Sequence, residues 1–332
     1  MIEFRHVSKT YPGSERPVVR DLSFEVPDGE ICVLVGPSGC GKTTSMRMVN
    51  RLIEITEGEI LIDGEPNTSL SGTQLRRKIG YAIQQIGLFP HRTIAVNIGT
   101  VPNLLGWDKG RIKSRVDELL DTVGLAPDDY RDRYPAELSG GQQQRVGVAR
   151  ALAADPPIML MDEPFGAVDP ITRESLQDEF LRIQRDIKKT IVFVTHDIDE
   201  AIKMGDKIAI LKQGGVLAQY DTPANILSHP DSEFVSSFVG ADRVLKRLSL
   251  TRVGDMDLEK ANGGTDDLIR ISEAVTVRDA LSELIGSGHS RAIVEKDGEN
   301  RLLTFGAIEE LTVGTSDEPV DGETSNGEEP PA

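Results

Sequence analysis

The sequence predicts an α/β fold, because apolar runs of strand length alternate with helical segments and polar residues follow the end of each run. Three runs are apolar throughout, as is typical of strands buried on both faces of a sheet: residues 31–35, 158–161 and 191–194. In open α/β sheets, ligands bind at the carboxyl ends of the strands. The residues after these runs are therefore the first candidates for a functional site.

A glycine-rich loop follows the first run and precedes a helical segment: Gly36-Pro37-Ser38-Gly39-Cys40-Gly41-Lys42-Thr43-Thr44. This order of strand, loop and helix is the setting of a phosphate-binding loop. Backbone N–H groups converge there on phosphate oxygens, and the helix N-terminus adds partial positive charge. We expect Lys42 to reach the β- and γ-phosphates of a nucleotide and Thr43 to bind Mg²⁺. An ordinary glycine turn is the alternative, and the flanking elements argue against it.

Length and hydropathy set the broad class of the chain. Its 332 residues suit two or three domains. No run approaches 18 apolar residues, and the N-terminus lacks the basic-then-apolar pattern of a signal peptide. We expect a cytoplasmic protein that touches a membrane only through a partner.

Charge argues against a nucleic-acid partner, which requires a basic surface. The formal net charge is −17, and residues 249–332 hold 19 acidic and 7 basic residues, a net charge of −12. The two cysteines, Cys32 and Cys40, have neither the spacing nor the setting of a disulfide or a zinc site. Cys40 is either a reactive thiol near the nucleotide or a bystander in the loop.

The segments before and after the phosphate loop read as strands and helices around it. Residues 1–30 predict short antiparallel strands with turns between them, and Tyr11 beside the first turn can either stack on an adenine ring or pack. A strand at residues 79–83 delivers Gln84 at its end. Residues 93–121 show helical spacing and predict a packed helical subdomain.

A second candidate anion site is the turn Ser139-Gly140-Gly141-Gln142, which opens a helix that continues to residue 153. Backbone N–H groups are again exposed at a helix N-terminus. The second apolar run ends in Asp162 and Glu163, where one carboxylate can hold Mg²⁺ and its neighbour can face a water molecule.

The helix after the acidic pair begins at Asp169, with Pro170 in its first turn. The third apolar run ends in Thr195-His196-Asp197. Among the five histidines, only His196 stands at such a strand end, so we expect it to contact the γ-phosphate.

The C-terminal third predicts a separate small unit. Residues 241–248 read as a connector after the first domain, residues 1–240. Residues 249–313 show a small α/β pattern. Residues 314–332 are acidic, rich in Gly, Pro, Ser and Thr, and predicted to be disordered.

Together these motifs resemble the ATP-binding subunit of ATP-binding-cassette (ABC) transporters over residues 1–240. The phosphate loop, Gln84, Leu-Ser-Gly-Gly-Gln from 138, Met-Asp-Glu-Pro from 161 and Thr-His-Asp from 195 occur in the family's order. The resemblance implies a RecA-like phosphate-loop NTPase fold with antiparallel β and α-helical subdomains. Residues 48–54, 81–91 and 161–169 look most like cassettes of osmoprotectant importers, which take up glycine betaine, proline betaine, carnitine or choline.

Residues 249–313 are similar to one cystathionine-β-synthase-type (CBS) module. Such cassettes often carry a tandem pair, whereas this chain shows one. Ala307 stands where the module's pattern usually has an aspartate for ribose. This departure argues against nucleotide sensing and favours a structural role or a dimer contact.

The resemblance also implies roles for the candidate residues. Two copies of the chain would pair head to tail, so that ATP on the phosphate loop of one copy is covered by Ser139, Gly140, Gly141 and Gln142 of the other. Thr43, Asp162 and Gln84 would bind Mg²⁺, Glu163 would polarise the attacking water, and His196 would orient it. Asp169 would cross the dimer interface, and the exposed Ile86, Leu88 and Phe89 would receive a helix from a membrane-embedded permease.

Three other functions are compatible with part of the pattern. An importer for amino acids or polyamines would carry the same catalytic residues, because solute choice lies in the permease and an extracytoplasmic binding protein. A soluble ABC ATPase of translation or DNA repair would normally carry two cassettes or a long coiled coil, which this chain lacks. A regulatory nucleotide sensor is disfavoured by Ala307. We therefore expect an ATPase that uses ATP and Mg²⁺ at the cytoplasmic face of the membrane.

Overall fold

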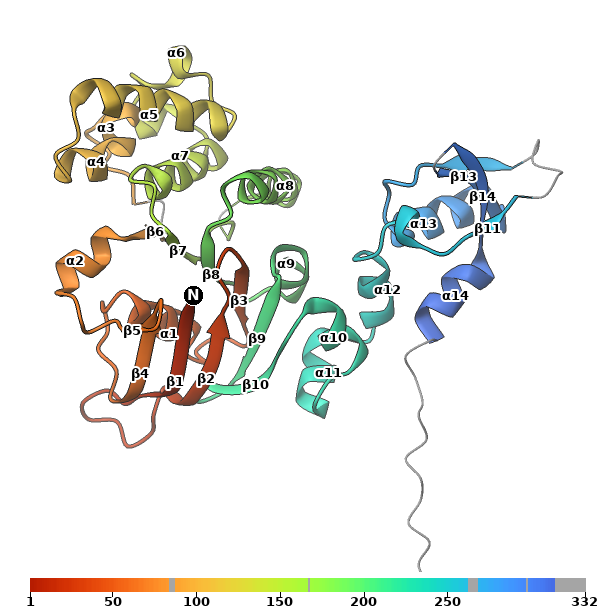
Figure 1. Cartoon of the computed structure of the whole chain (residues 1–332), viewed down its shortest axis with the longest axis horizontal. Helices are drawn as coiled ribbons and strands as arrows, with labels where there is room; N and C mark the ends of the chain where they lie inside the picture. The colour runs from red at the N-terminus through yellow and green to blue at the C-terminus, as the bar shows by residue number, and fades with distance from the viewer. Residues whose placement is uncertain (84–86, 167, 262–267, 297, 314–332) are drawn as a thin grey trace, which may run out of the picture. The chain divides into compact units, whose positions relative to one another are not determined.

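The three apolar runs form neighbouring strands of one sheet in the first of two units, Met1–Ala241 and Asp242–Ala332 (Figure 1). The structure, a computed structural model, describes residues 1–83, 87–166, 168–261, 268–296 and 298–313. Three predictions, on Gln84, on Ile86 and on the acidic tail at 314–332, lie outside these residues.

The sheet has six strands in the order β10-β9-β3-β8-β7-β6. Its five parallel strands are β9 (Lys207–Lys212), β3 (Ile31–Val35), β8 (Thr190–Val194), β7 (Ile158–Asp162) and β6 (Ile79–Ala82); β10 (Val216–Asp221) is an antiparallel edge strand. Every residue of β3, β7 and β8 is buried, as their unbroken apolar sequences predict. Because these three strands are parallel neighbours, their carboxyl ends meet at one edge.

N-terminal residues of the unit form a smaller antiparallel sheet, in the order β2-β1-β4-β5. Its strands are β1 (Ile2–Lys9), β2 (Val19–Val26), β4 (Glu57–Ile62) and β5 (Glu65–Pro66). Helix α1 (Lys42–Val49) packs its buried Met46, Met48 and Val49 into the same apolar core as Ile2, Phe4 and other residues of this sheet. The phosphate loop is thus anchored on both sides, by β3 before it and α1 after it.

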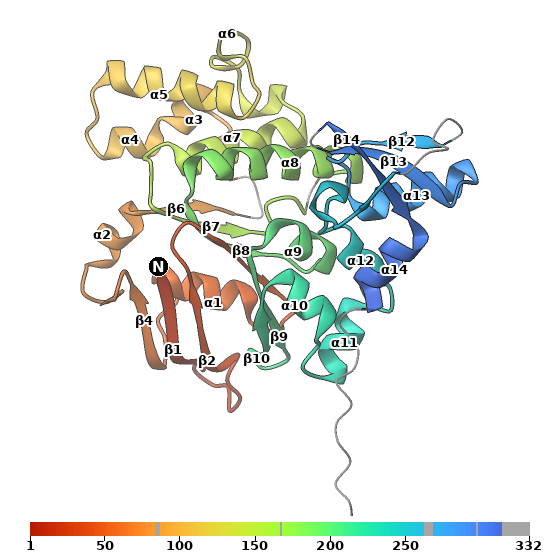
Figure 2. The same ribbon diagram turned by 45° about the vertical axis from the view of Figure 1, so that its right-hand side comes forward.

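The helical subdomain gathers beyond the β6 and β7 edge (Figures 1 and 2). It contains α3 (Ile94–Ile98), α4 (Thr100–Leu104), α5 (Lys109–Thr122), α6 (Pro127–Tyr130), the 3-10 turn at Pro135–Glu137 and α7 (Gly140–Leu152). The stretch expected to be helical from 93 to 121 is divided into three helices. One break follows Gly106, whose φ of +76° is costly for other residues, and Asp108 then caps α5 through the N–H groups of Gly110 and Arg111.

The remaining helices of the first unit are α2 (Gly72–Arg77), α8 (Pro170–Ile187), α9 (Ile198–Met204), α10 (Pro223–Ser228) and α11 (Glu233–Val239). Asp169 caps α8, as predicted, by accepting the Thr172 N–H at 3.1 Å. No helix within the described ranges is long and apolar enough to cross a membrane.

The second unit is built on its own apolar core and a four-stranded sheet in the order β11-β14-β13-β12. Its elements are α12 (Arg243–Leu248), the 3-10 turn at Val253–Asp255, β11 (Glu259–Lys260), β12 (Ile269–Ile271), α13 (Val277–Ser287), β13 (Arg291–Lys296), β14 (Glu299–Thr304) and α14 (Phe305–Val313). Residues 243–248, expected to be part of a connector, instead form α12. Leu248 is buried in this core, so the segment packs with the second unit.

Candidate functional site

The phosphate loop begins where β3 ends and closes where α1 starts. Gly36 has a φ of +151°, and a Cβ atom added there would lie 2.1 Å from the Leu211 carbonyl oxygen, so only glycine fits. Lys42 is buried and folds back over the loop, where its Nζ donates to the carbonyl oxygens of Gly36 at 2.8 Å and Pro37 at 3.1 Å. The loop therefore holds an ammonium group at its mouth beside converging backbone N–H groups.

A cleft of about 710 Å³ opens over this loop. That volume is within the range of small-molecule sites and large enough for a nucleotide. It is lined by Val18, Gly36, Pro37, Ser38, Gly39, Gly41, Lys42, Thr43, Thr44, Glu163 and His196. Most of the predicted phosphate-binding and catalytic residues are therefore brought together, although they come from three distant parts of the sequence.

Val18 is a lining residue that the sequence analysis missed. It is the residue before β2 and lies tightly over the loop: a Cβ atom added at Gly41 would lie 2.7 Å from its carbonyl oxygen, and one added at Gly215 would lie 2.4 Å from it. The close contacts of Val18 with Gly41 and Gly215 join segments that are far apart in the sequence, so the sequence alone does not reveal them.

The acidic pair at the end of β7 faces two different partners. Asp162 is buried and accepts a hydrogen bond from Thr43 Oγ1 at 2.9 Å, and its other carboxylate oxygen lies 3.5 Å from Arg47 Nη2. Burial is the main reason that the pKa of the Asp162 carboxyl lies above its usual value, while Thr43 and Arg47 oppose this effect. Arg47 is a second residue that the sequence analysis missed.

Glu163 has a different partner, because its Oε1 lies 3.3 Å from Nδ1 of His196. Its backbone N–H donates to the Val194 carbonyl at 2.9 Å, and its φ is +45°, which is uncommon for a residue other than glycine. The neighbouring strand β8 thus fixes an unusual turn after Asp162. This turn separates the two carboxylates, so that they can serve different functions.

The donor set beside the loop fits Mg²⁺. The Thr43 hydroxyl and the Asp162 carboxylate are hard oxygen ligands, and the 2.9 Å between their oxygens shows that both reach one point. Mg²⁺ is usually held by one or two such protein oxygens together with phosphates and water. Gln84, the third expected ligand, lies outside the described residues.

Four other expected ATP-binding residues are found at the start of α7. Ser139 caps this helix: its hydroxyl accepts the Gln142 N–H at 3.3 Å, and the Gln142 Oε1 accepts the Ser139 N–H at 2.9 Å. None of the four, Ser139, Gly140, Gly141 and Gln142, lines the cleft in the part of the chain that the structure describes. Within one copy the glycine turn thus contributes to the start of α7 and not to the phosphate loop.

Three further candidates also lie apart from the cleft lining. Tyr11 is exposed, and Lys9 Nζ lies 5.2 Å from the centre of its ring. Asp169 lies at the start of α8. Cys40 has a fully buried side chain, and burial raises the pKa of its thiol, so its environment favours the bystander reading over that of a reactive thiol.

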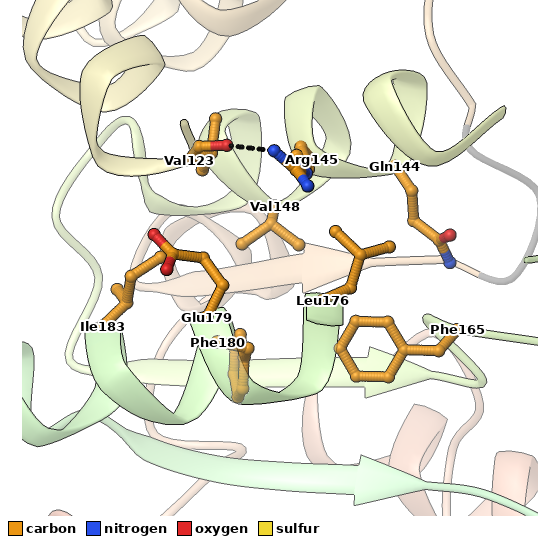
Figure 3. A pocket seen from close by; sticks show the side chains of 9 residues that line it. All are labelled: Val123, Gln144, Arg145, Val148, Phe165, Leu176, Glu179, Phe180 and Ile183. Carbon is orange, nitrogen blue, oxygen red and sulfur yellow. Dashed lines mark hydrogen bonds between the residues drawn. The ribbon is translucent and has the colours of Figure 1, made fainter. Parts of the chain in front are cut away.

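A different pocket lies between α7 and α8 and is lined mainly by apolar side chains (Figure 3). Phe165, Leu176 and Phe180 lie along one side of it and Val148 along the other. Its volume is about 20 Å³, which is the space of a single water molecule. This pocket is a packing gap in the helical region and is too small for a nucleotide.

Comparison of the whole chain with known proteins shows which family it belongs to. The family model described as ABC transporter matches residues 19–166. The osmoprotectant import ATP-binding protein OsmV of Salmonella typhimurium is 52% identical over 308 residues, which are 92% of this chain and 78% of the relative. The chain belongs to the ATP-binding subunits of ABC transporters.

Two further comparisons support this family membership. The glycine betaine/carnitine/choline transport ATP-binding protein OpuCA of Bacillus subtilis is 55% identical, over 77% of this chain and 67% of the relative. A bacterial ABC transporter cassette solved as a dimer is similar in structure, with a TM-score of 0.60 and 33% identity over 67% of this chain and 99% of that one. The same cassette, bound to ADP and Pi after hydrolysis, gives the same TM-score of 0.60.

Proposed function

We propose that this chain is the ATP-hydrolysing subunit of an importer for an osmoprotectant, such as glycine betaine, carnitine, choline or a related quaternary amine. The observation that carries the proposal is the 52% identity to an osmoprotectant import protein over 92% of the chain. The phosphate loop, Glu163 and His196 around one cleft, with Asp162 bound to Thr43 of the loop, supply the chemistry that ATP hydrolysis requires.

A second copy of the chain completes the ATP site in this proposal. Ser139, Gly140, Gly141 and Gln142 present a helix N-terminus that lies apart from the cleft of their own copy. Head-to-tail pairing brings this turn and Asp169 over the phosphates bound by the partner. A related cassette has been solved as a dimer, which supports such pairing. ATP would then close the dimer, and hydrolysis would let it open.

Hydrolysis rests on positioning and charge. The phosphate loop and Lys42 bind the β- and γ-phosphates. Thr43 and Asp162 would hold Mg²⁺, which would supply charge to neutralise the phosphates. Glu163 accepts a hydrogen bond from the attacking water and polarises it. His196, 3.3 Å from Glu163, orients that water and the γ-phosphate. The leaving ADP remains on the loop until the dimer opens.

The permease is proposed to dock on a groove of about 510 Å³ in the helical subdomain, formed by α3, α4 and α5. Val96 of α3 and Leu104 of α4 line it and are 49% and 71% exposed, so the groove presents two apolar side chains to a partner. Basic side chains also line the groove, at Arg92, Lys109 and Lys113, while Arg131 is paired with Asp117 of the same lining at 3.0 Å. A permease helix with apolar and acidic residues would complement this surface. Of the residues expected to receive it, Phe89 is exposed, Leu88 packs against the core, and Ile86 lies outside the described residues.

We expect Leu104→Glu to weaken binding of the purified chain to its permease by at least about ten-fold, because a charge would replace an apolar contact in the groove. ATP hydrolysis by the isolated chain should stay unchanged, since the groove is separate from the cleft lining. Co-purification with the permease in detergent measures the first quantity. Ile285→Glu, at an exposed apolar position of the second unit, is the matched control. Equal permease binding by Leu104→Glu and the control would contradict the assignment of the groove.

The second unit is proposed to be one CBS-like module with a structural or dimer-contact role. Its sheet combines a parallel pair, β12 and β13, with antiparallel neighbours, and the unit adds the helices α12, α13 and α14, which supports the predicted small α/β arrangement. Through the permease, the chain would lie at the cytoplasmic face of the membrane, and an extracytoplasmic binding protein would deliver the solute.

The test of solute class is the ATPase activity of the chain reconstituted in liposomes with its permease and binding protein. We expect stimulation by glycine betaine or choline and none by an amino acid. Stimulation by an amino acid or polyamine alone would keep the ATPase assignment and overturn the osmoprotectant assignment.

A further inference from the structure

A buried carboxylate lies beneath the turn that carries His196. Glu200 belongs to α9 and is 8% exposed, and its Oε1 accepts a hydrogen bond from Gln177 Nε2 of α8 at 2.9 Å. Gln177 is equally buried, at 6% exposure. Burial of a carboxylate is energetically costly unless hydrogen bonds compensate for the lost contact with water. Glu200 lines no part of the cleft among the described residues.

The first turn of α9 joins Glu200 to the turn that carries His196. Thr195 Oγ1 accepts the Asp197 N–H at 3.1 Å. Thr195 and Asp197 are the two residues that flank His196. The Asp197 side chain in turn accepts the N–H of Asp199 at 2.8 Å and of Glu200 at 3.3 Å. The backbone on both sides of His196 is therefore tied to Glu200.

Helix α8 connects this network to the other side of the site. It begins at Asp169, and four residues later Arg173 Nη2 donates to the Val168 carbonyl at 3.1 Å. The charge of Arg173 also acts on Glu200. Gln177 lies one turn further along α8. Helix α8 therefore contacts both sides of the site. Arg173 in its first turns binds the Val168 carbonyl, and Gln177, one turn later, binds Glu200.

We propose that Glu200 is a positioning residue that holds the Thr195-His196-Asp197 turn against α8. His196 and Asp169 then keep a fixed separation when the dimer closes. The inference rests on the proposed function, in which His196 orients water and the γ-phosphate and Asp169 faces the second copy. Glu200 acts through His196 and does not touch ATP.

Glu200→Ala tests this inference in the purified full-length chain. We expect kcat for ATP hydrolysis to fall about ten-fold, since small misplacements of catalytic groups have effects of this size or larger. The Kd for ATP should change less than about two-fold, because every phosphate-loop contact remains. Glu200→Gln keeps an acceptor for Gln177 and should recover most of the lost kcat.

The decisive comparison repeats Glu200→Ala in a His196→Ala background. If Glu200 acts through His196, the second substitution lowers kcat no further. An equal fold-loss in both backgrounds would overturn the inference, because Glu200 would then act independently of His196. A His196→Ala variant with wild-type kcat would instead overturn the role of His196 in the proposed function.

Two more variants separate positioning from folding. Gln177→Leu keeps about the size of the side chain and removes the hydrogen bond that joins Glu200 to α8, so it should reproduce the loss of kcat even if Glu200→Ala does not fold. Lys203→Met removes another link between α9 and α8, the 2.7 Å ion pair of Lys203 with Asp178, which does not involve Glu200. It should leave kcat unchanged. Equal losses in Gln177→Leu and Lys203→Met would contradict the proposal.

Discussion

Replacement of Glu163 by Gln is expected to lower kcat for ATP hydrolysis by about 10³-fold, since a positioned general base contributes on this scale. The amide keeps the size of the side chain but cannot take up a proton or polarise water as a carboxylate does. ATP binding should remain, because the phosphate-loop contacts and the Asp162 to Thr43 pair are unchanged. A closed dimer that cannot hydrolyse ATP should accumulate, and size-exclusion chromatography with ATP and Mg²⁺ would detect it.

The neighbouring carboxylate provides the matched control. Asp162→Asn changes the same chemical group one residue earlier, on the side that faces Thr43 and Arg47. We expect it to weaken Mg²⁺-dependent ATP binding and therefore not to trap the dimer. If Glu163→Gln hydrolyses ATP at the wild-type rate, or if both variants behave alike, the two carboxylates do not have the separate functions that their different partners indicate.

Replacement of Lys42 by Ala is expected to weaken ATP binding by at least about 100-fold, because a charge-assisted contact to phosphate is removed from a buried site. The same change also removes the two hydrogen bonds that Lys42 donates to the carbonyl oxygens of Gly36 and Pro37. The loop should then lose part of its shape along with its charge. Titration with a fluorescent ATP analogue gives the affinity.

Thermal unfolding gives an independent readout of the same prediction. ATP raises the Tm of a protein that binds it only in the folded state. Wild-type protein and a Lys78→Ala control, changed at an exposed lysine after α2, should show this rise. Lys42→Ala should not. A normal rise with Lys42→Ala would show that ATP binds outside the cleft over the phosphate loop.

The main architecture was predictable because its signals are local. Each of three strands is an unbroken apolar run that ends in a polar motif, and parallel strands place their carboxyl ends at one edge. That geometry brings Lys42, Glu163 and His196 to one cleft, as expected. The start of α8 was likewise set by a local rule, an N-cap aspartate followed by proline.

The rest depends on contacts between distant segments. Val18 reaches the cleft only because β2 packs over Gly41 and Gly215, and Arg47 meets Asp162 only because α1 lies beside β7. The sequence analysis did not single out Glu200, since its burial arises from the packing of α8 on α9. The division of residues 93–121 into three helices rests on positions such as Gly106, whose backbone angle a periodicity argument does not reveal.

The most direct test of the proposed function is uptake of labelled glycine betaine into liposomes that contain the chain and its permease, with binding protein outside and ATP inside. The account predicts uptake with the wild-type chain and none beyond a single turnover with Glu163→Gln. Equal sustained uptake by both would contradict coupling of transport to hydrolysis at this cleft. No uptake of glycine betaine, choline or carnitine, with uptake of an amino acid instead, would contradict the osmoprotectant assignment.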